Sequence, residues 1–470
     1  MVFSSLLFIF IYLVVTLALY YTVPNRVYRN VILCVLSLIF YGWGEPSFVL
    51  LMIFSIAFNW LAGLLVGKYR NNKKRCKAVL VASVVLNLAL LGVFKYTGFV
   101  VDTLKAVFPF MRSYATPIIP LPIGISFYTF QAMSYVIDVY RNDTSVQKNP
   151  VYFGTYVALF PQLIAGPIVR YRDIADQLEN RHENVAQFAS GIKLFTVGLA
   201  KKVLLANVLY ELITVFQKSR DLSVLFYWLY AVSFTLQLYF DFSGYSDMAI
   251  GLGRIFGFRF SENFNYPYIS GSITEFWRRW HISLGSWFRD YVYIPLGGNR
   301  VSKAKWLRNI LVVWMLTGLW HGASWNFVLW GLGFAVLLVA EKLVYGRLLQ
   351  RTHVLKHVYT LLLVTLSFVL FNADSVSEAV SQLGAMFGAG GLPLVSTEGV
   401  YYLKSYAGTF LFAAIGATPL VSNAISRFGK TRFGAQALTV LQPLVMLALL
   451  AACTAFLVDG SFNPFLYFRF

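Results

Sequence analysis

The chain has 470 residues, of which 58% are hydrophobic and only 13% are charged. The charged share is about half of that in soluble domains, and the apolar residues come in long runs, so the composition excludes an ordinary soluble protein. Lysine and arginine number 39, against 20 aspartate and glutamate residues. This excess is typical of the loops of a membrane protein, and no nucleic-acid-binding motif accompanies it.

In chain order, the apolar runs predict an all-α polytopic membrane protein, because helices satisfy their own backbone hydrogen bonds in lipid and the alternating strands of a barrel are absent. We expect about eleven transmembrane helices, within about two. No connecting loop is long enough for a soluble domain, so residues 1–470 are predicted to form a single integral membrane domain. The candidate segments are 2–22, 29–44, 47–67, 78–98, 119–139, 150–169, 190–216, 224–256, 309–341, 355–372, 405–424 and 437–457.

The densest basic cluster lies in the loop after the third segment, and it consists of Lys68, Arg70, Lys73, Lys74, Arg75 and Lys77. The positive-inside rule places this loop in the cytoplasm. Since three predicted spans precede it, we expect an extracytoplasmic N-terminus and a cytoplasmic position for Arg26 and Arg29. The first segment lacks a basic start and a cleavage site, which predicts a retained span rather than a signal peptide.

The three cysteines predict neither a disulfide framework nor a metal site. Cys34 and Cys453 lie within apolar runs, and Cys76 lies in the basic loop. The sequence also lacks the His-Glu-x-x-His metal motif and the Gly-x-Ser-x-Gly nucleophile motif. We therefore expect no metal and no bound cofactor.

Two carboxylates, Asp241 and Asp247, interrupt the apolar segment at 224–256. An aspartate at membrane depth costs about 2.5–3.5 kcal/mol on insertion scales and therefore faces a partner or a cavity. Two interpretations stay open, namely a structural pair with an arginine or tyrosine and a role in binding substrate. The glycines nearby indicate helix packing, because no strand precedes them and no Lys-Ser/Thr pair follows them.

The stretch from Thr274 to Tyr291 is amphipathic at 100° per residue. Its apolar face comprises Phe276, Trp280, Leu284, Trp287 and Tyr291, and its charged face comprises Arg278, Arg279, Arg289 and Asp290. The stretch is too charged to span a bilayer and too aromatic for a free loop, which indicates an interfacial or re-entrant helix. A plain membrane anchor is the alternative, but His281 at the border between the faces favours a role in a cavity.

The apolar run from Ile310 to Ala340 is too long for one straight span of about 20 residues. A break near His321 would place this histidine at a helix end inside the membrane. Burial there favours the neutral imidazole, which can act as a general base. The residues that allow such a break are Gly318, Gly322, Ser324 and Asn326.

Six segments together resemble the membrane-bound O-acyltransferase (MBOAT) family, and most of all its bacterial branch of alginate and peptidoglycan O-acetyltransferase membrane subunits. The resemblance covers roughly residues 1–342, with a family-like core at about 115–342. The matching segments, in the family's order, are 121–128 (LPIGISFY), 163–168 (LIAGPI), 239–247 (YFDFSGYSD), 275–281 (EFWRRWH), 296–300 (LGGNR) and 319–322 (LWHG).

The resemblance implies a ring of helices around a thinned centre with a central catalytic cavity. It places His321 at the family's catalytic histidine and His281 at its second polar-site histidine. The candidate substrate-binding residues are Asp241, Trp320, Asn326, Arg278 and Arg289. The arginines are candidates to attract the donor's phosphates, although membrane anchoring explains them equally well. Some relatives carry a third histidine where this chain has Trp330-Gly331-Leu332-Gly333-Phe334, so no role for it is carried over.

The implied reaction is transfer of an acyl group, expected to be acetyl, from acetyl-CoA or another cytosolic thioester toward a cell-surface polysaccharide. The expected location is the bacterial plasma (inner) membrane. An extracytoplasmic partner carrying a serine is expected to receive the acyl group, and no nucleic acid is involved. Three alternatives stay open: a transporter or flippase, which would not consume the donor; D-alanyl transfer to teichoic acid; and a structural subunit, which would tolerate loss of His321.

Overall fold

The computed structural model describes residues 1–460, and no strand occurs among them, which confirms the all-α prediction. The described residues form two compact units. Unit 1 comprises Met1–Phe195 and Asp247–Ser261, and unit 2 comprises Thr196–Ser246 and the chain from Glu262 onward. The predicted grouping of the whole chain into a single membrane domain stays a prediction.

The helices of unit 1 begin where side chains cap the first turn or proline opens it. Asn25 and Asn72 each accept a hydrogen bond from a backbone N–H three residues later, and Asn149, just before Pro150, accepts one from the N–H of Val151. The helices are α1 (Leu13–Thr22), α2 (Arg26–Gly44), α3 (Val49–Lys68), α4 (Lys73–Leu91), α5 (Thr97–Val107), α6 (Ile125–Arg141), α7 (Pro150–Ala158), α8 (Phe160–Leu163) and α9 (Tyr171–Asn180). Wider turns, η1 (Phe8–Tyr12) and η3 (Gly92–Tyr96), adjoin α1 and α4.

Helices α10 (Val185–Ala200) and α12 (Val224–Ile255) run through the boundary between the units. The other helices of unit 2 are α11 (Asn207–Lys218), α13 (Ile273–Arg279), α14 (Ile282–Phe288), α15 (Lys303–His321), α16 (Trp325–Ala340), α17 (Gly346–Gln350), α18 (Leu355–Asn372), α19 (Val376–Met386), α20 (Thr397–Ser405), α21 (Ala407–Gly416), α22 (Leu420–Phe428) and α23 (Arg432–Asp459). Wider turns at η5 (Lys201–Ala206), η7 (Arg289–Tyr293) and η8 (Glu341–Tyr345) extend or connect them.

Among residues 1–460, six helical segments are long and apolar enough to cross a membrane. A seventh is added if α21 and α22, which are bent by 62°, count as one broken span. The predicted count of about eleven stays a prediction, because the other expected segments fall on shorter, interrupted or more polar helices. The six segments are Arg26–Gly44, Pro46–Lys68, Lys73–Val107, Trp325–Gln350, Leu355–Asn372 and Arg432–Asp459.

The segment predicted at 150–169 is not one continuous helix. Helix α7 has nine residues and ends at Ala158, and α8 adds only four. Nine helical residues cover about 14 Å, which is less than half of the hydrocarbon core. The interruption lies at Leu159, whose backbone (φ −51°, ψ 109°) is not helical, and Pro161 has no N–H to continue the helix through this point.

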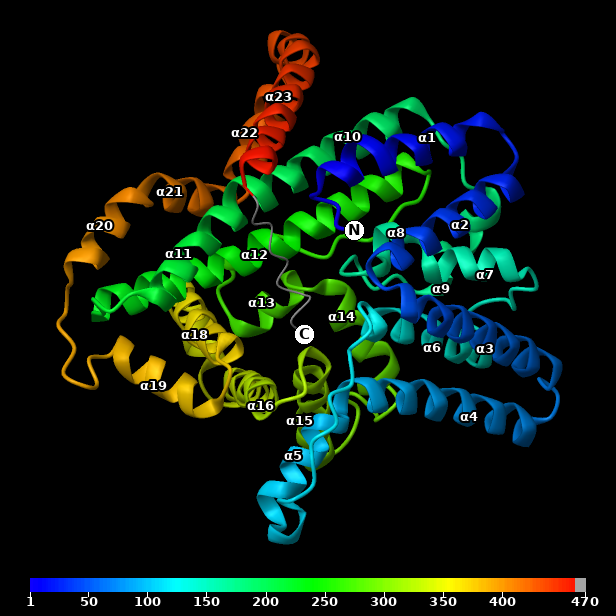
Figure 1. Cartoon of the computed structure of the whole chain (residues 1–470), viewed down its shortest axis with the longest axis horizontal. Helices are drawn as coiled ribbons and strands as arrows, with labels where there is room; N and C mark the ends of the chain where they lie inside the picture. Colours follow the sequence, from blue (N-terminus) through cyan, green and yellow to red (C-terminus); the bar gives the residue numbers. More distant parts are fainter. Residues whose placement is uncertain (461–470) are drawn as a thin grey trace. The chain divides into compact units, whose positions relative to one another are not determined.

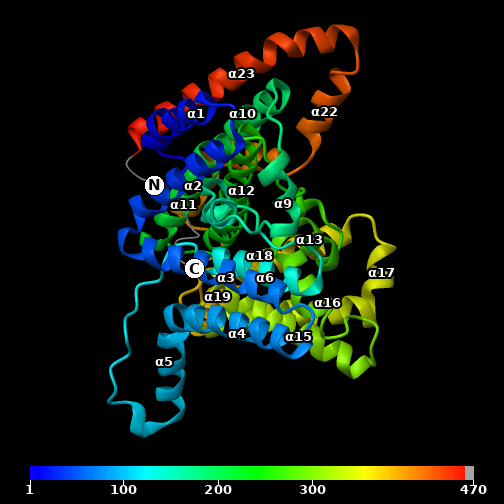
Figure 2. The ribbon, with the colours of Figure 1, turned by 90° about the vertical axis from the view of Figure 1, so that its right-hand side faces the viewer.

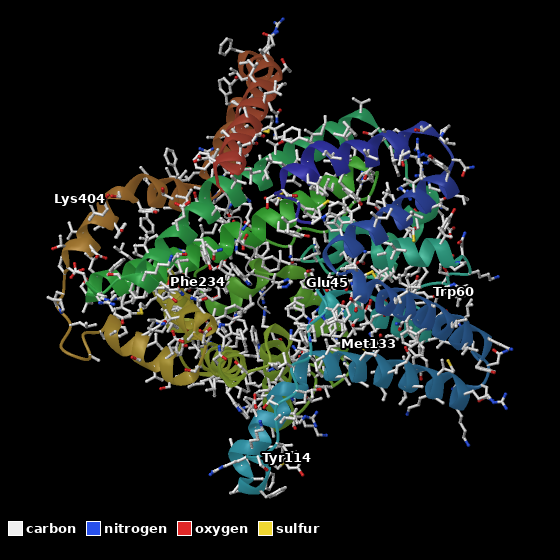
Figure 3. The ribbon with its side chains drawn as sticks, in the orientation of Figure 1. Glu45, Trp60, Tyr114, Met133, Phe234 and Lys404 are labelled. Atoms are coloured by element: carbon white, nitrogen blue, oxygen red, sulfur yellow. The ribbon has the colours of Figure 1, made fainter. Side chains whose placement is uncertain are left out.

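In unit 1, α3, α4 and α6 lie side by side (Figures 1 and 2). Asn59 of α3 and Asn87 of α4 are buried and exchange two hydrogen bonds, of 3.1 and 2.8 Å. Paired amides hold helices together in lipid, because each would otherwise face hydrocarbon. Trp60, labelled in Figure 3, donates to the Gln147 carbonyl at 2.9 Å and fastens α3 to the segment after α6.

A second polar network in unit 1 centres on Glu183, which lies between α9 and α10. Its carboxylate accepts from Arg26 at 2.6 Å and from Arg29 at 2.7 Å, and Tyr20 also donates to it. Burial disfavours the Glu183 carboxylate, but the hydrogen bonds from Arg26 and Tyr20 outweigh burial and lower its pKa to about 2. The network ties the turn between α1 and α2 to the start of α10.

In unit 2, α15 and α16 form a tightly packed pair (Figure 1). A Cβ atom on Gly318 would lie 2.2 Å from the Phe327 carbonyl oxygen, and one on Gly331 would lie 2.2 Å from that of Trp314. Glycine is therefore required at both positions for the backbones to approach. Helix α23 instead carries many exposed apolar side chains along its length (Figure 3), as a lipid-facing helix does.

Candidate active site

His321 is the last residue of α15, and the helix stops there. Gly322 is extended, with φ −164° and ψ 155°, and α16 begins three residues after it at Trp325. The predicted break in the run from Ile310 to Ala340 is therefore confirmed. The His321 side chain is buried, with 4% of its surface exposed.

Aromatic rings enclose the His321 imidazole. The ring centroids of Trp320, Trp330 and Phe371 lie 5.0, 5.1 and 5.4 Å from that of His321. The His281 ring lies 6.4 Å away, centroid to centroid. Two imidazoles thus share an aromatic enclosure within unit 2, which excludes bulk water and strengthens electrostatic interactions inside it.

His281 lies between two short helices rather than within one. Its backbone is left-handed, with φ +46°, and it separates α13 from α14. The continuous helix predicted from Thr274 to Tyr291 is wrong at this point. Its predicted faces are confirmed, since Phe276, Trp280 and Leu284 are buried whereas Arg278 and Arg289 are exposed. A left-handed backbone is unusual for a residue other than glycine and here directs the imidazole inward.

Asn263 fixes the tautomer of His281. Its side-chain oxygen accepts from the backbone N–H of Ser283 at 3.1 Å and from the Ser283 hydroxyl at 2.9 Å, which identifies that atom as the oxygen. The same oxygen lies 3.2 Å from Nδ1 of His281, so Nδ1 carries the proton. Nε2 then keeps its lone pair. Burial lowers the pKa of His281 to about 3, so the ring is neutral at physiological pH.

Glu341, in η8 directly after α16, holds the start of α13. Its carboxylate accepts from the backbone N–H groups of Ile273 at 2.6 Å and Thr274 at 3.0 Å, and from the Thr274 hydroxyl at 2.8 Å. Ser272 caps the same helix by accepting from the Glu275 N–H at 3.0 Å. The helix that precedes His281 is therefore anchored to the end of α16.

Asp241 pairs with a lysine that the sequence analysis did not single out. Nζ of Lys202 lies 2.6 Å from Oδ1 of Asp241, and both side chains are 2% exposed. Gln237 lies one turn before Asp241, and its amide approaches the other carboxylate oxygen at 3.5 Å. This geometry matches the structural interpretation of Asp241, with lysine in place of the expected arginine or tyrosine.

The remaining candidate residues lie in different surroundings. Trp320 touches both histidines, with its ring centroid 5.7 Å from that of His281. Asn326 donates to the Ala373 carbonyl at 2.8 Å and thereby fastens the start of α16 to the end of α18. Arg289 is exposed and bonds to its neighbour Asp290 at 2.8 Å. The structure brings Trp320 together with the histidines but does not place Asn326 or Arg289 in the same enclosure.

Arg278 lines a separate pocket of about 780 Å³ beside α13. Lys342 and Arg347 add two cations to its wall, and Glu275 and Glu341 add two carboxylates. The Lys342 ammonium lies 4.3 Å from the centre of the Trp306 ring. The pocket is polar and basic, and it lies at the α15 end opposite to His321.

Three polar residues of the site were missed by sequence reasoning: Asn263, Lys202 and Glu341. A charge inside an apolar run was the available signal for Lys202 and Glu341, as it was for Asp241. Asn263 lies in a segment of loop character, where an asparagine gives no distinct signal.

Comparisons with known proteins agree with this geometry. A family model described as MBOAT, membrane-bound O-acyltransferase family, matches residues 141–376, which is about half of the chain and contains both histidines. The probable alginate O-acetylase AlgI of Azotobacter vinelandii is 40% identical over 512 residues that cover 100% of both chains. The peptidoglycan O-acetyltransferase of Helicobacter pylori is 33% identical, covering 84% of this chain and 81% of that relative.

A more distant relative is the teichoic acid D-alanyltransferase of Bacillus subtilis, which is 32% identical over 46% of this chain and 58% of its own. The family match and the full-length likeness together show the family of the chain. The chain belongs to the membrane-bound O-acyltransferase family and is a membrane-embedded O-acyltransferase.

Proposed function

We propose that this enzyme moves an acetyl group from a cytosolic thioester, acetyl-CoA, toward a cell-surface polysaccharide, with His321 as the general base. The observation that carries the proposal is the position of His321 at a helix break inside an aromatic enclosure, 6.4 Å from His281. Relatives named for alginate and peptidoglycan O-acetylation support the acetyl group and the polysaccharide class.

The proposed reaction needs one base and no metal step. His321 takes the proton of an acceptor hydroxyl, whose oxygen attacks the thioester carbonyl carbon. The carbon–sulfur bond then breaks, and the leaving thiolate takes the proton from the imidazolium. General-base catalysis of this kind contributes roughly 10²–10⁴-fold. The surrounding rings of Trp320, Trp330 and Phe371 keep water from competing for the thioester.

His281 supports this step as a neutral hydrogen-bond acceptor. Asn263 holds the proton of His281 on Nδ1, so the Nε2 lone pair is available to an O–H group in the enclosure. Nε2 has no hydrogen bond to any other residue in the described part of the chain. We expect it to orient the acceptor hydroxyl or the His321 ring.

The pocket beside α13 is the proposed entrance for the donor. Trp306 lines this pocket, and His321 ends the same helix fifteen residues later, so about 22 Å of α15 separates them. A donor with an anionic head and a long thioester arm fits this arrangement. Arg278, Lys342 and Arg347 would attract the head, and the arm would reach the histidines.

A partner protein is proposed for the final transfer. The described residues form only helices and the segments that connect them, and His321 is buried, so we expect that a stiff polymer does not reach the base. An extracytoplasmic protein carrying a serine would collect the acetyl group and pass it to the polymer. The proposed location of the enzyme is the plasma membrane, with the basic loop at Lys68–Lys77 in the cytoplasm.

The test is acetyl transfer by the purified chain in liposomes with labelled acetyl-CoA on the cytosolic side. His321→Ala should abolish transfer, His281→Ala should impair it strongly, and His353→Ala, an exposed histidine elsewhere, should leave it unchanged. Normal transfer by a well-folded His321→Ala enzyme would refute the assignment. If the enzyme transfers D-alanine from a carrier protein and does not use acetyl-CoA, the proposal of an acetyl donor is wrong and D-alanyl transfer takes its place.

The sidedness of the basic loop needs an introduced cysteine. Cys76 was predicted to lie in this loop, but it belongs to α4 and its thiol is buried, so it is a poor target for any reagent. Lys74→Cys places a thiol at an exposed position of the same cluster. In a background without the three native cysteines, labelling by an impermeant reagent should require permeabilised cells, and ready labelling of intact cells would invert the topology.

A further inference from the structure

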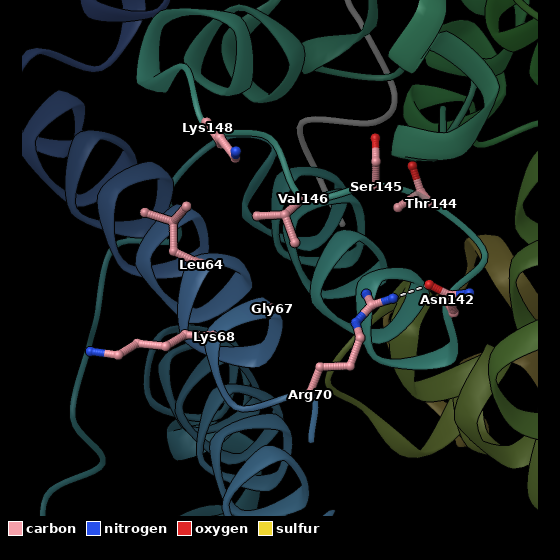
Figure 4. Close-up of a pocket in the computed structure, with 9 residues that line it drawn as sticks. All are labelled: Leu64, Gly67, Lys68, Arg70, Asn142, Thr144, Ser145, Val146 and Lys148. Atoms are coloured by element: carbon pink, nitrogen blue, oxygen red, sulfur yellow. Dashed lines mark hydrogen bonds between the residues drawn. The ribbon is translucent and has the colours of Figure 1, made fainter. Parts of the chain in front are cut away.

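A second basic pocket lies in unit 1, away from both histidines in the sequence. It has a volume of about 640 Å³ and lies between the end of α3 and the loop that follows α6 (Figure 4). Three cations line it: Lys68, Arg70 and Lys148. Thr144 and Ser145 add two hydroxyl side chains from the same loop as Lys148, and the Lys68 side chain extends away from Arg70 (Figure 4).

The wall of this pocket is built by specific contacts. Arg70 donates to the side-chain oxygen of Asn142 and to the Val139 carbonyl, the latter at 3.1 Å. Asn142 ends α6 in a left-handed conformation, with φ +66°, which turns the chain toward the pocket. Further along the loop, Tyr135 accepts from the Gln147 backbone N–H at 3.1 Å. The loop is therefore held in place before any ligand arrives.

The charges in the pocket are not balanced by carboxylates. No aspartate or glutamate lines it, and the nearest acid in the loop, Asp143, faces Arg172 at 3.6 Å. Within residues 1–460, neither Lys68 nor Lys148 forms an ion pair. Lys68 lies 5.9 Å from the centre of the Tyr69 ring, which leaves its ammonium exposed. Clustered cations of this kind favour an anionic ligand.

The pocket lies where a membrane-spanning helix meets the headgroup region. The span Pro46–Lys68 ends at one of the three cations. In the two turns before that end, α3 exposes Leu61 and Leu65, whose surfaces are 50% and 39% exposed. Leu64 and Val146 form the apolar part of the pocket wall. One ligand would thus meet cations at its head and an apolar helix face along its tails.

We propose that this pocket binds the headgroup of an anionic phospholipid. Arg70 would bind the phosphodiester, and the exposed side chains of Lys68 and Lys148 would turn toward it, while the glycerol hydroxyls would bond to Thr144 and Ser145. Arg70 has five N–H donors, so it keeps donors for a phosphate beyond those used on Asn142 and Val139. A free phosphate shares the chemistry of the head but makes no use of the apolar face of α3, so lipid is the source that the site favours.

The experiment measures lipid binding to the purified full chain after delipidation, by native mass spectrometry. Phosphatidylglycerol is compared with phosphatidylcholine of the same acyl chains. Lys68→Gln/Lys148→Gln removes two pocket charges and keeps both side chains polar. The matched control is Lys73→Gln/Lys74→Gln, which removes two exposed charges of the same basic cluster that do not line the pocket.

Each interfacial charge is worth about fivefold in binding, so the pocket variant should lose about 25-fold in phosphatidylglycerol affinity and the control less than twofold. Lys148→Gln alone should lose about fivefold. Unfolding midpoints without lipid should match among all variants. Equal losses in the pocket and control variants, or equal binding of both lipids by the native chain, would overturn the proposal. So would binding of inorganic phosphate or tail-less glycerophosphoglycerol as tightly as phosphatidylglycerol.

Discussion

Replacing Asp241 with asparagine tests whether this carboxylate serves the fold or the substrate. The Lys202 ammonium lies 2.6 Å from Asp241, and both groups are 2% exposed. Asparagine keeps the shape of the side chain but removes its charge, so the buried lysine loses the carboxylate of this pair. Breaking a buried ion pair by removing one partner costs about 3–5 kcal/mol.

The double variant Lys202→Met/Asp241→Asn removes both charges with similar volumes. Because two buried charges that cancel each other are often replaced at little net cost, we expect the double variant to regain most of the lost stability. The coupling free energy between the two sites should therefore be at least about 2 kcal/mol. The assay is denaturant unfolding in detergent, followed by helical circular dichroism, for the native chain, both single variants and the double variant.

Stability and activity separate the two interpretations of Asp241. If the pair is structural, the double variant regains acetyl transfer together with stability. If Asp241 binds substrate, the double variant folds well but transfers poorly. A double variant no more stable than Asp241→Asn would refute the reasoning from the ion pair.

Three further predictions concern the contacts around the site and in unit 1. Asn263→Asp keeps an acceptor for the His281 proton but adds a negative charge that makes the ring more basic, so the acid limb of the pH–rate profile should move to higher pH. Asn263→Ala removes the acceptor and should lower activity about 10–100-fold, by analogy with outer-shell partners of ligating histidines. Glu341→Gln loses a charged acceptor of two backbone N–H groups, so a thermal scan should show a loss of about 1.5–3 kcal/mol. The pKa of Glu183 is lowered from its ordinary value of 4.5 to about 2. The stabilisation of the fold by this carboxylate is therefore complete above pH 4.5 and is lost as the pH falls toward 2. Glu183→Gln should flatten this acid dependence of the unfolding midpoint.

The sequence predicted the environment of His321 better than that of His281. Glycine and serine inside an overlong apolar run mark a break, and α15 does end at His321. The break at His281 left no trace in the periodicity, because α13 and α14 both keep their apolar side chains buried across it. A left-handed residue at the junction changes the direction of the chain without changing which face is apolar.

The buried charges show a different limit of sequence reasoning. Asp241 was singled out, yet Lys202 was not, because a lysine beside Lys201 resembles an interfacial anchor. Lys202 and Glu341 both lie in wide turns, η5 and η8, where an extra residue per turn shifts side chains off the α-helical pattern. Their partners also lie far along the chain, so no local pattern connects them.

Hydropathy likewise predicted the presence of apolar segments but not their continuity. Residues 150–169 are apolar enough for a span, but the turn at Leu159 before Pro161 divides them into α7 and α8. The contact between Arg70 and Asn142 places the loop after α6 beside the basic cluster. Contacts between distant segments help to decide which apolar runs cross the bilayer. A hydropathy pattern carries no information on such contacts.

The two histidines lie at different helix ends, and this difference bears on the roles proposed for them. His321 lies at the C-terminus of α15, where unsatisfied carbonyl groups carry partial negative charge and stabilise an imidazolium. His281 instead lies between the C-terminus of α13 and the N-terminus of α14, whose opposite partial charges offset each other. Burial therefore decides its charge state and keeps the ring neutral. A base that gains a proton during the reaction is favoured at the position of His321. A hydrogen-bond acceptor that stays neutral is favoured at the position of His281. The backbone around the pair therefore supports His321 as the proton acceptor and His281 as its neutral partner.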